Sequence, residues 1–151
     1  MENDIPEAKK SELPGLPHGT ILGKTIDGII GYNCNYENFP DKNYALWDYS
    51  NYYEGIYTGF KWQCVEFARR YWIIKKRIII PPVSWAAHLW KLQSVARVDD
   101  YAIVPIVAHP NNGTVKPEVD DLFIYRSTPK ERVGHVSVVV EVLENSVRVA
   151  E

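Results

Sequence analysis

Residues 60–76 read FKWQCVEFARRYWIIKK and carry the clearest helical pattern in the chain. Apolar side chains recur there at intervals of three or four residues, which is the spacing of one face of an α-helix. That face consists of Phe60, Cys64, Phe67, Ala68, Tyr71 and Ile74. Charged residues occupy positions between them, and Pro81 and Pro82 prevent the helix from continuing. The pattern therefore predicts an amphipathic helix with Cys64 near its start.

The sequence after this helix changes from helical to strand-like patterns. Ser84 is placed to cap a second helix, with a buried face made of Trp85, Ala86, Leu89, Trp90 and Leu92. From residue 101 onward the pattern is that of strands, at residues 102–104, 122–125, 135–143 and 147–149. Turn-forming residues separate these strands at 110–113 and 144–146.

The sequence before the helix contains little regular pattern. Residues 19–23 and 28–32 predict two short strands around a turn at Asp27-Gly28. Residues 33–57 are aromatic and polar without a period, and we interpret them as an ordered surface loop. Helices that precede strands, without βαβ alternation, indicate an α+β fold. We expect a flexible lead over residues 1–17 and one domain over residues 18–151.

Composition excludes several classes of function. The chain has 151 residues, a formal net charge of −2 and 13% aromatic residues. A nearly neutral chain without clustered Lys and Arg argues against a general nucleic-acid binder. Two cysteines without a CxxC pair argue against a disulfide framework and against structural zinc. Without an apolar leader or a long apolar run, the chain is expected to be cytoplasmic and without membrane contact.

Three residues are candidates for chemistry, and each also has an ordinary structural interpretation. Cys64 lies where a helix dipole stabilises a thiolate, but a small buried hydrophobic residue fits the same position. His135 follows Gly134 on the less apolar face of a strand, where a half-buried structural histidine is also common. Glu151 ends the last strand, where a solvated charge is also common.

The three candidates nevertheless match the needs of a cysteine hydrolase. A cysteine nucleophile requires a base within hydrogen-bond reach and a third group that orients the base. The chain order of Cys, His and acid, with the helix before the strands, is that of papain-like hydrolases. A tight turn on Asn145 would place Glu151 opposite Val139, about 13 Å along the strand from His135. We therefore predict a longer connection over residues 141–146, with Val147 opposite Val140.

A family resemblance rests on three segments of the chain. Residues 59–70, GFKWQCVEFARR, are very similar to the nucleophile segment of the amidase (CHAP) domain of bifunctional glutathionylspermidine/trypanothione synthetase/amidases. Residues 18–23, HGTILG, resemble the opening strand of that domain. Residues 134–136 and 147–151 resemble its histidine and acid strands, which the wider CHAP superfamily of amidohydrolases and peptidases shares. The resemblance covers most of residues 18–151.

This resemblance implies a fold, a reaction and a set of roles. The implied fold is the papain-like CHAP cysteine amidase fold, with N-terminal helices packed on an antiparallel β-sheet or half-barrel. The implied roles are Cys64 as nucleophile, His135 as base and Glu151 as orienting acid. The implied reaction hydrolyses glutathionylspermidine, and also trypanothione as a second candidate, with glutathione and spermidine as products of the first. No metal or cofactor is needed.

Two further residues are candidates for holding the substrate. Gln63 would assist the Cys64 backbone N–H in holding the oxyanion, although on a helix it points about 100° away and also suits a polar helix start. Arg69 would bind a carboxylate of glutathione, or else lie on a solvated helix face.

The chain departs from the family pattern in two ways. Family members continue past the acid with Gln-Asn and a further strand, so we expect the domain here to lack its last strand. They also carry an ATP-dependent synthetase domain, which this sequence lacks and which a longer parent chain would supply. Two alternative functions remain open at this point: a CHAP peptidoglycan amidase or endopeptidase, and an inactive module that binds thiol–polyamine conjugates or a partner protein.

Overall fold

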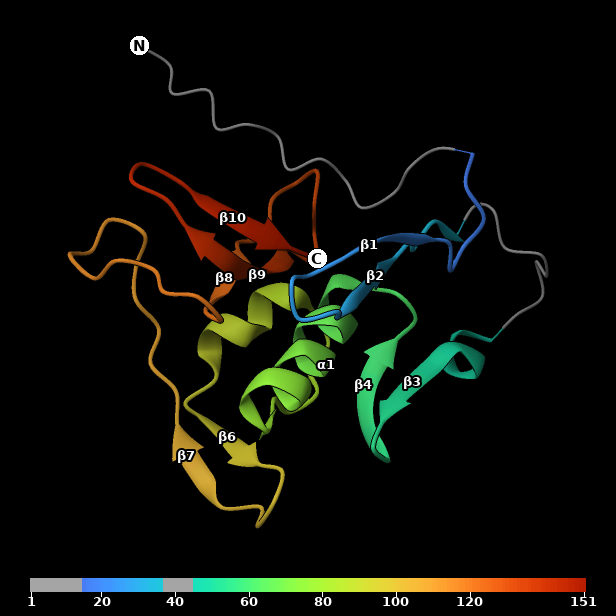
Figure 1. Ribbon diagram of the computed structural model, residues 1–151, viewed down its shortest axis with the longest axis horizontal. Coiled ribbons are helices and arrows are strands. Elements are labelled where there is room, and N and C mark those ends of the chain that lie inside the picture. Colours follow the sequence, from blue (N-terminus) through green and yellow to red (C-terminus); the bar gives the residue numbers. More distant parts are fainter. Residues whose placement is uncertain (1–14, 37–44) are drawn as a thin grey trace.

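The computed structural model describes residues 15–36 and 45–151 (Figure 1). Most of the predicted lead, residues 1–14, and part of the predicted surface loop, residues 37–44, lie outside the described residues. Leu16 and Pro17 already belong to the fold, because their carbonyl oxygens accept hydrogen bonds from the Asn33 side-chain amide at 2.9 and 3.2 Å.

The described residues form one α-helix (α1), ten strands (β) and two short 3₁₀ helices (η). In chain order these are β1 (Ile21–Lys24), β2 (Ile30–Tyr32), η2 (Leu46–Tyr49), β3 (Ser50–Tyr53), β4 (Ile56–Phe60), α1 (Cys64–Lys76), β5 (Ile78–Ile79), η3 (Ala86–Lys91), β6 (Ser94–Arg97), β7 (Ile103–Pro105), β8 (Leu122–Tyr125), β9 (His135–Val142) and β10 (Val147–Ala150).

All strand pairs among these elements are antiparallel. They form four small sheets, in the orders β1-β2, β3-β4, β5-β6-β7 and β10-β9-β8. The predicted α+β class is confirmed, but over the described residues the strands do not join into one continuous sheet.

Helix α1 lies in the middle of the molecule, with the β8–β10 sheet on one side and the β3–β4 hairpin on the other (Figure 1). Phe67, Ala68 and Tyr71 of this helix join Val136 and Val138 of β9 in the main hydrophobic core. Each of these side chains is at most 4% exposed. Burying a large apolar side chain contributes roughly 1.5–3 kcal/mol, so this contact fixes the helix against β9.

The bounds of α1 correct the predicted helix at its beginning. Phe60 is the last residue of β4, and Gln63 caps the helix with an extended backbone at φ −67° and ψ 158°. The chain therefore enters the helical conformation only at Cys64. At the other end Arg77 takes the left-handed conformation, and its N–H donates to the Trp72 carbonyl, a common way of ending a helix.

Residues 33–57, predicted as a surface loop without a period, include β3, the hairpin turn and the beginning of β4. The turn residues, Glu54 and Gly55, have φ values of 50° and 77°. Two positive φ values match the twist of a tight hairpin, and Gly55 adopts such a value without steric strain. The flanking Tyr, Ile and Thr residues favour strands. The Glu-Gly turn between them was therefore the signal in the sequence that could have indicated this hairpin.

The predicted second helix is instead the six-residue 3₁₀ helix η3, capped by Trp85 and not by Ser84. Ala86 and Leu89 are buried, while Trp85 and Trp90 are each 46% exposed. The buried residues are three positions apart, which fits the three residues per turn of a 3₁₀ helix better than the 3.6 of an α-helix.

Among the helices of the described residues, none is both long enough and apolar enough to cross a lipid bilayer.

Candidate active site

Cys64 is the first residue of α1, which agrees with its predicted place near the start of the helix. The first backbone hydrogen bond at this end joins the Phe67 N–H to the Gln63 carbonyl at 3.1 Å, so the N–H groups of the preceding residues have no partner within the helix. These groups and the helix dipole favour an anion at the position of the sulfur. The Cys64 side chain is half-buried, whereas Cys34, the other free thiol, is buried.

His135 begins β9, and the backbone of Gly134 determines how closely it approaches its neighbours. Gly134 has a φ of 68°, and a Cβ atom there would lie 2.5 Å from the Tyr125 carbonyl oxygen and 2.8 Å from the Ala87 Cβ. No side chain fits in that space, so only a glycine allows this close approach. The His135 ring then packs 5.5 Å from the Tyr125 ring.

The His135 ring has hydrogen-bond partners on both sides. Its Nε2 donates to the Oε2 of Glu151, and the Cys64 side chain is the second partner. Because Nε2 faces Glu151, Nδ1 is the nitrogen left for Cys64. The side chains of His135 and Glu151 are 23% and 18% exposed, so water screens the contact only in part.

These contacts determine the charge of the histidine. Burial alone would lower the pKa of His135, because it penalises the charged ring. The hydrogen bonds and charges of Cys64 and Glu151 outweigh burial and raise the pKa from 6.5 to about 10. The ring is therefore held as imidazolium between a sulfur and a carboxylate.

The connection between β9 and β10 differs from the predicted one. Val147 pairs with Val142 and not with Val140, and the Leu143 N–H donates to the Ser146 carbonyl at 2.8 Å, which closes a tight turn. The prediction of a longer connection was therefore wrong. Glu151 nevertheless reaches His135.

A β-bulge explains how Glu151 does so. Arg148 pairs with Glu141, but the next residue, Val149, pairs with Val139, so Val140 is an extra residue without a partner opposite. Without this bulge, Glu151 would continue opposite Val138, whose side chain points into the core on the other face. With it, the register places Glu151 opposite Ser137, on the face of His135 and two residues away, a diagonal distance that a long side chain spans.

Gln63 lies outside the helix that was predicted to contain it. Its extended backbone makes it the N-cap of α1, and its N–H donates to the Phe60 carbonyl at 2.9 Å. The helical angle of about 100° between neighbouring side chains therefore does not apply to Gln63 and Cys64. The side chain of Gln63 makes no capping hydrogen bond to the helix.

Arg69 does not lie on a solvated helix face. It is 3% exposed, its Nε donates to the Ile80 carbonyl at 2.8 Å, and its guanidinium lies 5.2 Å from the centre of the Tyr57 ring. Burial lowers the pKa of Arg69, and the neighbouring Tyr57 and Glu66 partly offset that effect. A role in binding a carboxylate stays a prediction.

A buried ion pair that was not predicted lies close to Cys64 in the first two turns of α1. Glu66 and Arg70 stand between the apolar positions of the helical pattern, but they are 1% and 8% exposed and form an ion pair at 2.8 Å. Their spacing of four residues was the available signal, because such residues are neighbours on a helix surface.

Two observations bear on ligands. A cavity of about 400 Å³ lies beside Trp62, with Tyr32, Asn51 and Arg70 also in its wall. Over residues 15–36 and 45–151, no three His, Cys, Asp or Glu side chains gather in an arrangement that would hold a metal ion.

Comparison with known proteins adds the following matches. The family described as CHAP domain matches residues 55–151, a range that includes Cys64, His135 and Glu151. Trypanothione synthetase from Crithidia fasciculata is 35% identical over 139 residues, which are 91% of this chain and 20% of that protein. Bifunctional glutathionylspermidine synthetase/amidase from Escherichia coli K12 is 31% identical over 148 residues, which are 95% of this chain and 24% of that protein. The chain thus spans about a fifth to a quarter of the length of these relatives.

Proposed function

Because this chain belongs to the CHAP domain family, whose members are generally hydrolytic amidases, we propose that it hydrolyses the amide bond of glutathionylspermidine. The observation that carries the proposal is the hydrogen-bonded series Cys64–His135–Glu151, with the sulfur at a helix N-terminus. The substrate is proposed from the relatives, one of which is named for glutathionylspermidine amidase activity. Trypanothione, a related conjugate, is the second substrate proposed.

In the proposed first step, the Cys64 thiolate attacks the glycyl carbonyl carbon of glutathionylspermidine. The C–S bond forms, and the carbonyl electron pair moves to oxygen, where the Cys64 backbone N–H and the Gln63 amide hold the oxyanion. When the C–N bond breaks, the His135 imidazolium gives its proton to the leaving spermidine nitrogen. Spermidine departs and glutathione remains on the enzyme as a thioester.

In the proposed second step, water replaces the amine. Neutral His135 takes a proton from water, and the resulting hydroxide attacks the thioester carbonyl. The C–S bond breaks, the glycine carboxylic acid of the released glutathione gives its proton through water to the freed amine, and the proton on His135 restores the imidazolium beside the thiolate. Glu151 stays ionised and holds the ring through Nε2, which keeps Nδ1 directed at the sulfur.

The same proposal includes the finer structural and cellular expectations. Helix α1, with its N-terminal cysteine facing a histidine on an antiparallel sheet, supports a papain-like arrangement for the domain. Arg69 is proposed to hold a glutathione carboxylate through nitrogens other than Nε, which the Ile80 carbonyl occupies. A thiolate nucleophile operates best under reducing conditions, so we propose a cytoplasmic reaction.

Substrate choice is tested by incubating the chain with glutathionylspermidine, trypanothione and a cross-linked muropeptide, and separating the products by liquid chromatography and mass spectrometry. We expect equal amounts of glutathione and spermidine from the first substrate and no cleavage of the muropeptide. Cleavage of the muropeptide alone would contradict the proposal and favour a peptidoglycan hydrolase. A chain that binds the conjugate without cleaving it would instead be an inactive binding module.

A further inference from the structure

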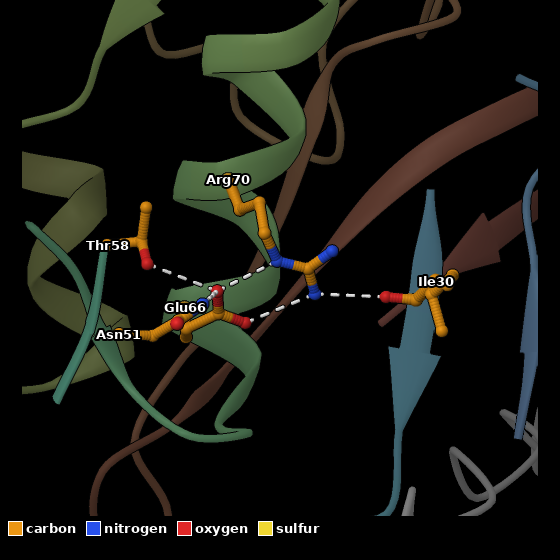
Figure 2. Close-up of polar contacts among 5 residues, drawn as sticks. All are labelled: Ile30, Asn51, Thr58, Glu66 and Arg70. Carbon is orange, nitrogen blue, oxygen red and sulfur yellow. Dashed lines mark hydrogen bonds and ion pairs between the residues drawn. The ribbon is translucent and has the colours of Figure 1, made fainter. Parts of the chain in front are cut away.

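The carboxylate of Glu66 lies in the first turn of α1, two residues after Cys64, and is saturated with hydrogen bonds (Figure 2). Its Oε1 accepts from Asn51 Nδ2 at 2.9 Å, from Thr58 Oγ1 at 3.1 Å and from Arg70 Nε at 2.8 Å. Its Oε2 accepts from Arg70 Nη2 at 3.2 Å. Four donors converge on one buried carboxylate, three of them from charged or amide groups.

Arg70 extends the same network to the other side of the helix (Figure 2). Its Nη2 also donates to the Ile30 carbonyl of β2 at 2.9 Å. The pair of Glu66 and Arg70 therefore connects the first turn of α1 to β3 through Asn51, to β4 through Thr58 and to β2 through Ile30. These contacts fix both the translation and the rotation of the turn that carries the nucleophile.

The backbone of β4 packs directly against Glu66. Gly59 has a φ of 136°, and a Cβ atom there would lie 3.2 Å from the Cα and Cβ of Glu66. The helix thus meets β4 at Glu66 by direct backbone contact. Hydrogen bonds and packing both fix this residue.

The energetics of the pair favour a role other than stability alone. Burying two charges removes both from water, and the attraction between them roughly offsets that cost, so a buried ion pair adds little net stability over an apolar pair. Its geometry is nevertheless specific, because the guanidinium fork accepts only one orientation of the carboxylate. The pairing also neutralises a negative charge two residues from Cys64, where an unpaired carboxylate would oppose a thiolate.

We propose that Glu66 and Arg70 are positioning residues for the nucleophile: their buried pair locks the first turn of α1 between β2 and the β3–β4 hairpin, and so holds Cys64 against His135. The inference rests on the proposed function of Cys64. It assigns Glu66 and Arg70 an action through the position of Cys64.

The test compares Arg70→Lys with Lys75→Gln. Lysine keeps the charge of Arg70 but lacks the fork that reaches Glu66 and Ile30 together. Lys75 is the matched control, because it also joins α1 to the β1–β2 turn, through an exposed ion pair with Asp27 at 2.7 Å, but has no link to the first turn. Each variant is assayed on glutathionylspermidine, and its folded fraction is measured by urea denaturation.

In Arg70→Lys we expect kcat to fall about tenfold or more, because small displacements of the reacting groups lower the reaction rate strongly. KM should stay within about twofold. The pH at which iodoacetamide alkylation of Cys64 reaches half its maximal rate should rise by about half a unit or more, because the thiolate loses support from His135. Both quantities should be unchanged in Lys75→Gln. A folded Arg70→Lys with wild-type kcat and an unchanged alkylation profile would overturn the proposal and leave the pair a purely structural role.

A milder variant keeps the test decisive if Arg70→Lys does not fold. Thr58→Val removes one hydrogen bond to Oε1 and leaves the ion pair intact, so kcat and the alkylation profile should move in the same directions by smaller amounts. No movement in folded Thr58→Val would contradict the proposal. Alkylation needs no substrate, so a chain that is inactive on glutathionylspermidine would disprove the proposed function while the alkylation profile still tests the positioning.

Discussion

His135 has a different charge from that of an ordinary histidine because of two neighbours. The contacts to Cys64 and Glu151 raise its pKa to about 10 against the effect of burial. In the proposed reaction the imidazolium protonates the leaving amine, so the proton must be present at the start of each turnover. The charge of the His135 ring therefore depends on both Cys64 and Glu151.

We predict that activity declines at high pH as His135 loses its proton. In the wild type, kcat/KM should fall as pH rises through about 10. Glu151→Gln removes a negative charge that raises this pKa, so its alkaline decline should begin at lower pH. Glu141→Gln is the matched control, because Glu141 lies on β9, as His135 does, but pairs with Arg148 at the surface. Identical alkaline limbs in wild type and Glu151→Gln would show that Glu151 does not act on His135.

The same pKa shift predicts how stability varies with pH. A folded pKa above the unfolded value contributes stability that is fully present below about pH 6.5 and is lost as pH rises through about 10. The free energy of unfolding, from urea denaturation, should therefore fall between these pH values in wild type. The fall should be smaller in Glu151→Gln.

Individual residues were predictable to different degrees. The positions of Cys64 at a helix start and His135 at a strand start followed from local periodicity, which both elements obey. Glu66, Arg69 and Arg70 stand between the apolar positions of the helical pattern, yet they are buried, because α1 is surrounded by strands on several sides. Local periodicity cannot reveal how many sides of a helix are covered.

The β9–β10 hairpin shows what local turn rules miss. The residues 144–146 do form the turn that their chemistry suggested, and the Leu143–Ser146 hydrogen bond closes it. The bulge at Val140 then changes the face on which Glu151 lies. A bulge depends on packing against neighbouring elements, so the sequence of the hairpin alone did not predict it.

At the start of β9, we predict that Gly134→Ala disturbs both stability and activity. The new Cβ would meet the Tyr125 carbonyl and the Ala87 side chain, and the φ of 68° disfavours any residue with a Cβ. Strain and overpacking together should destabilise the protein by about 2–4 kcal/mol and displace His135.

The matched control is Gly23→Ala, where a Cβ meets no atom within 4 Å and φ is not in the left-handed range. Its stability should change by no more than about 0.5 kcal/mol. Thermal and urea denaturation measure both variants. An unaltered Gly134→Ala would mean that the approach to His135 is less tight than the structure indicates.

At the scale of the whole molecule, the described residues place α1 among four small antiparallel sheets. The α+β class was predictable, because the order of helical and strand patterns along the chain is a local property. The grouping of the strands into four sheets was not, although each pair joins consecutive strands, because β5 and β6 are too short to show a period. The candidate site depends on this grouping, because α1, β9 and the end of β10 supply one member each.

The central claim is that Cys64 cleaves glutathionylspermidine within this fold. The most direct measurement is the rate of spermidine release from glutathionylspermidine, compared among the wild type, Cys64→Ala and Cys34→Ser. We predict release by the wild type and by Cys34→Ser at similar rates, and none by Cys64→Ala, although it should unfold at the same urea concentration as wild type. Release by Cys64→Ala at the wild-type rate, or no release by the wild type, would contradict the account.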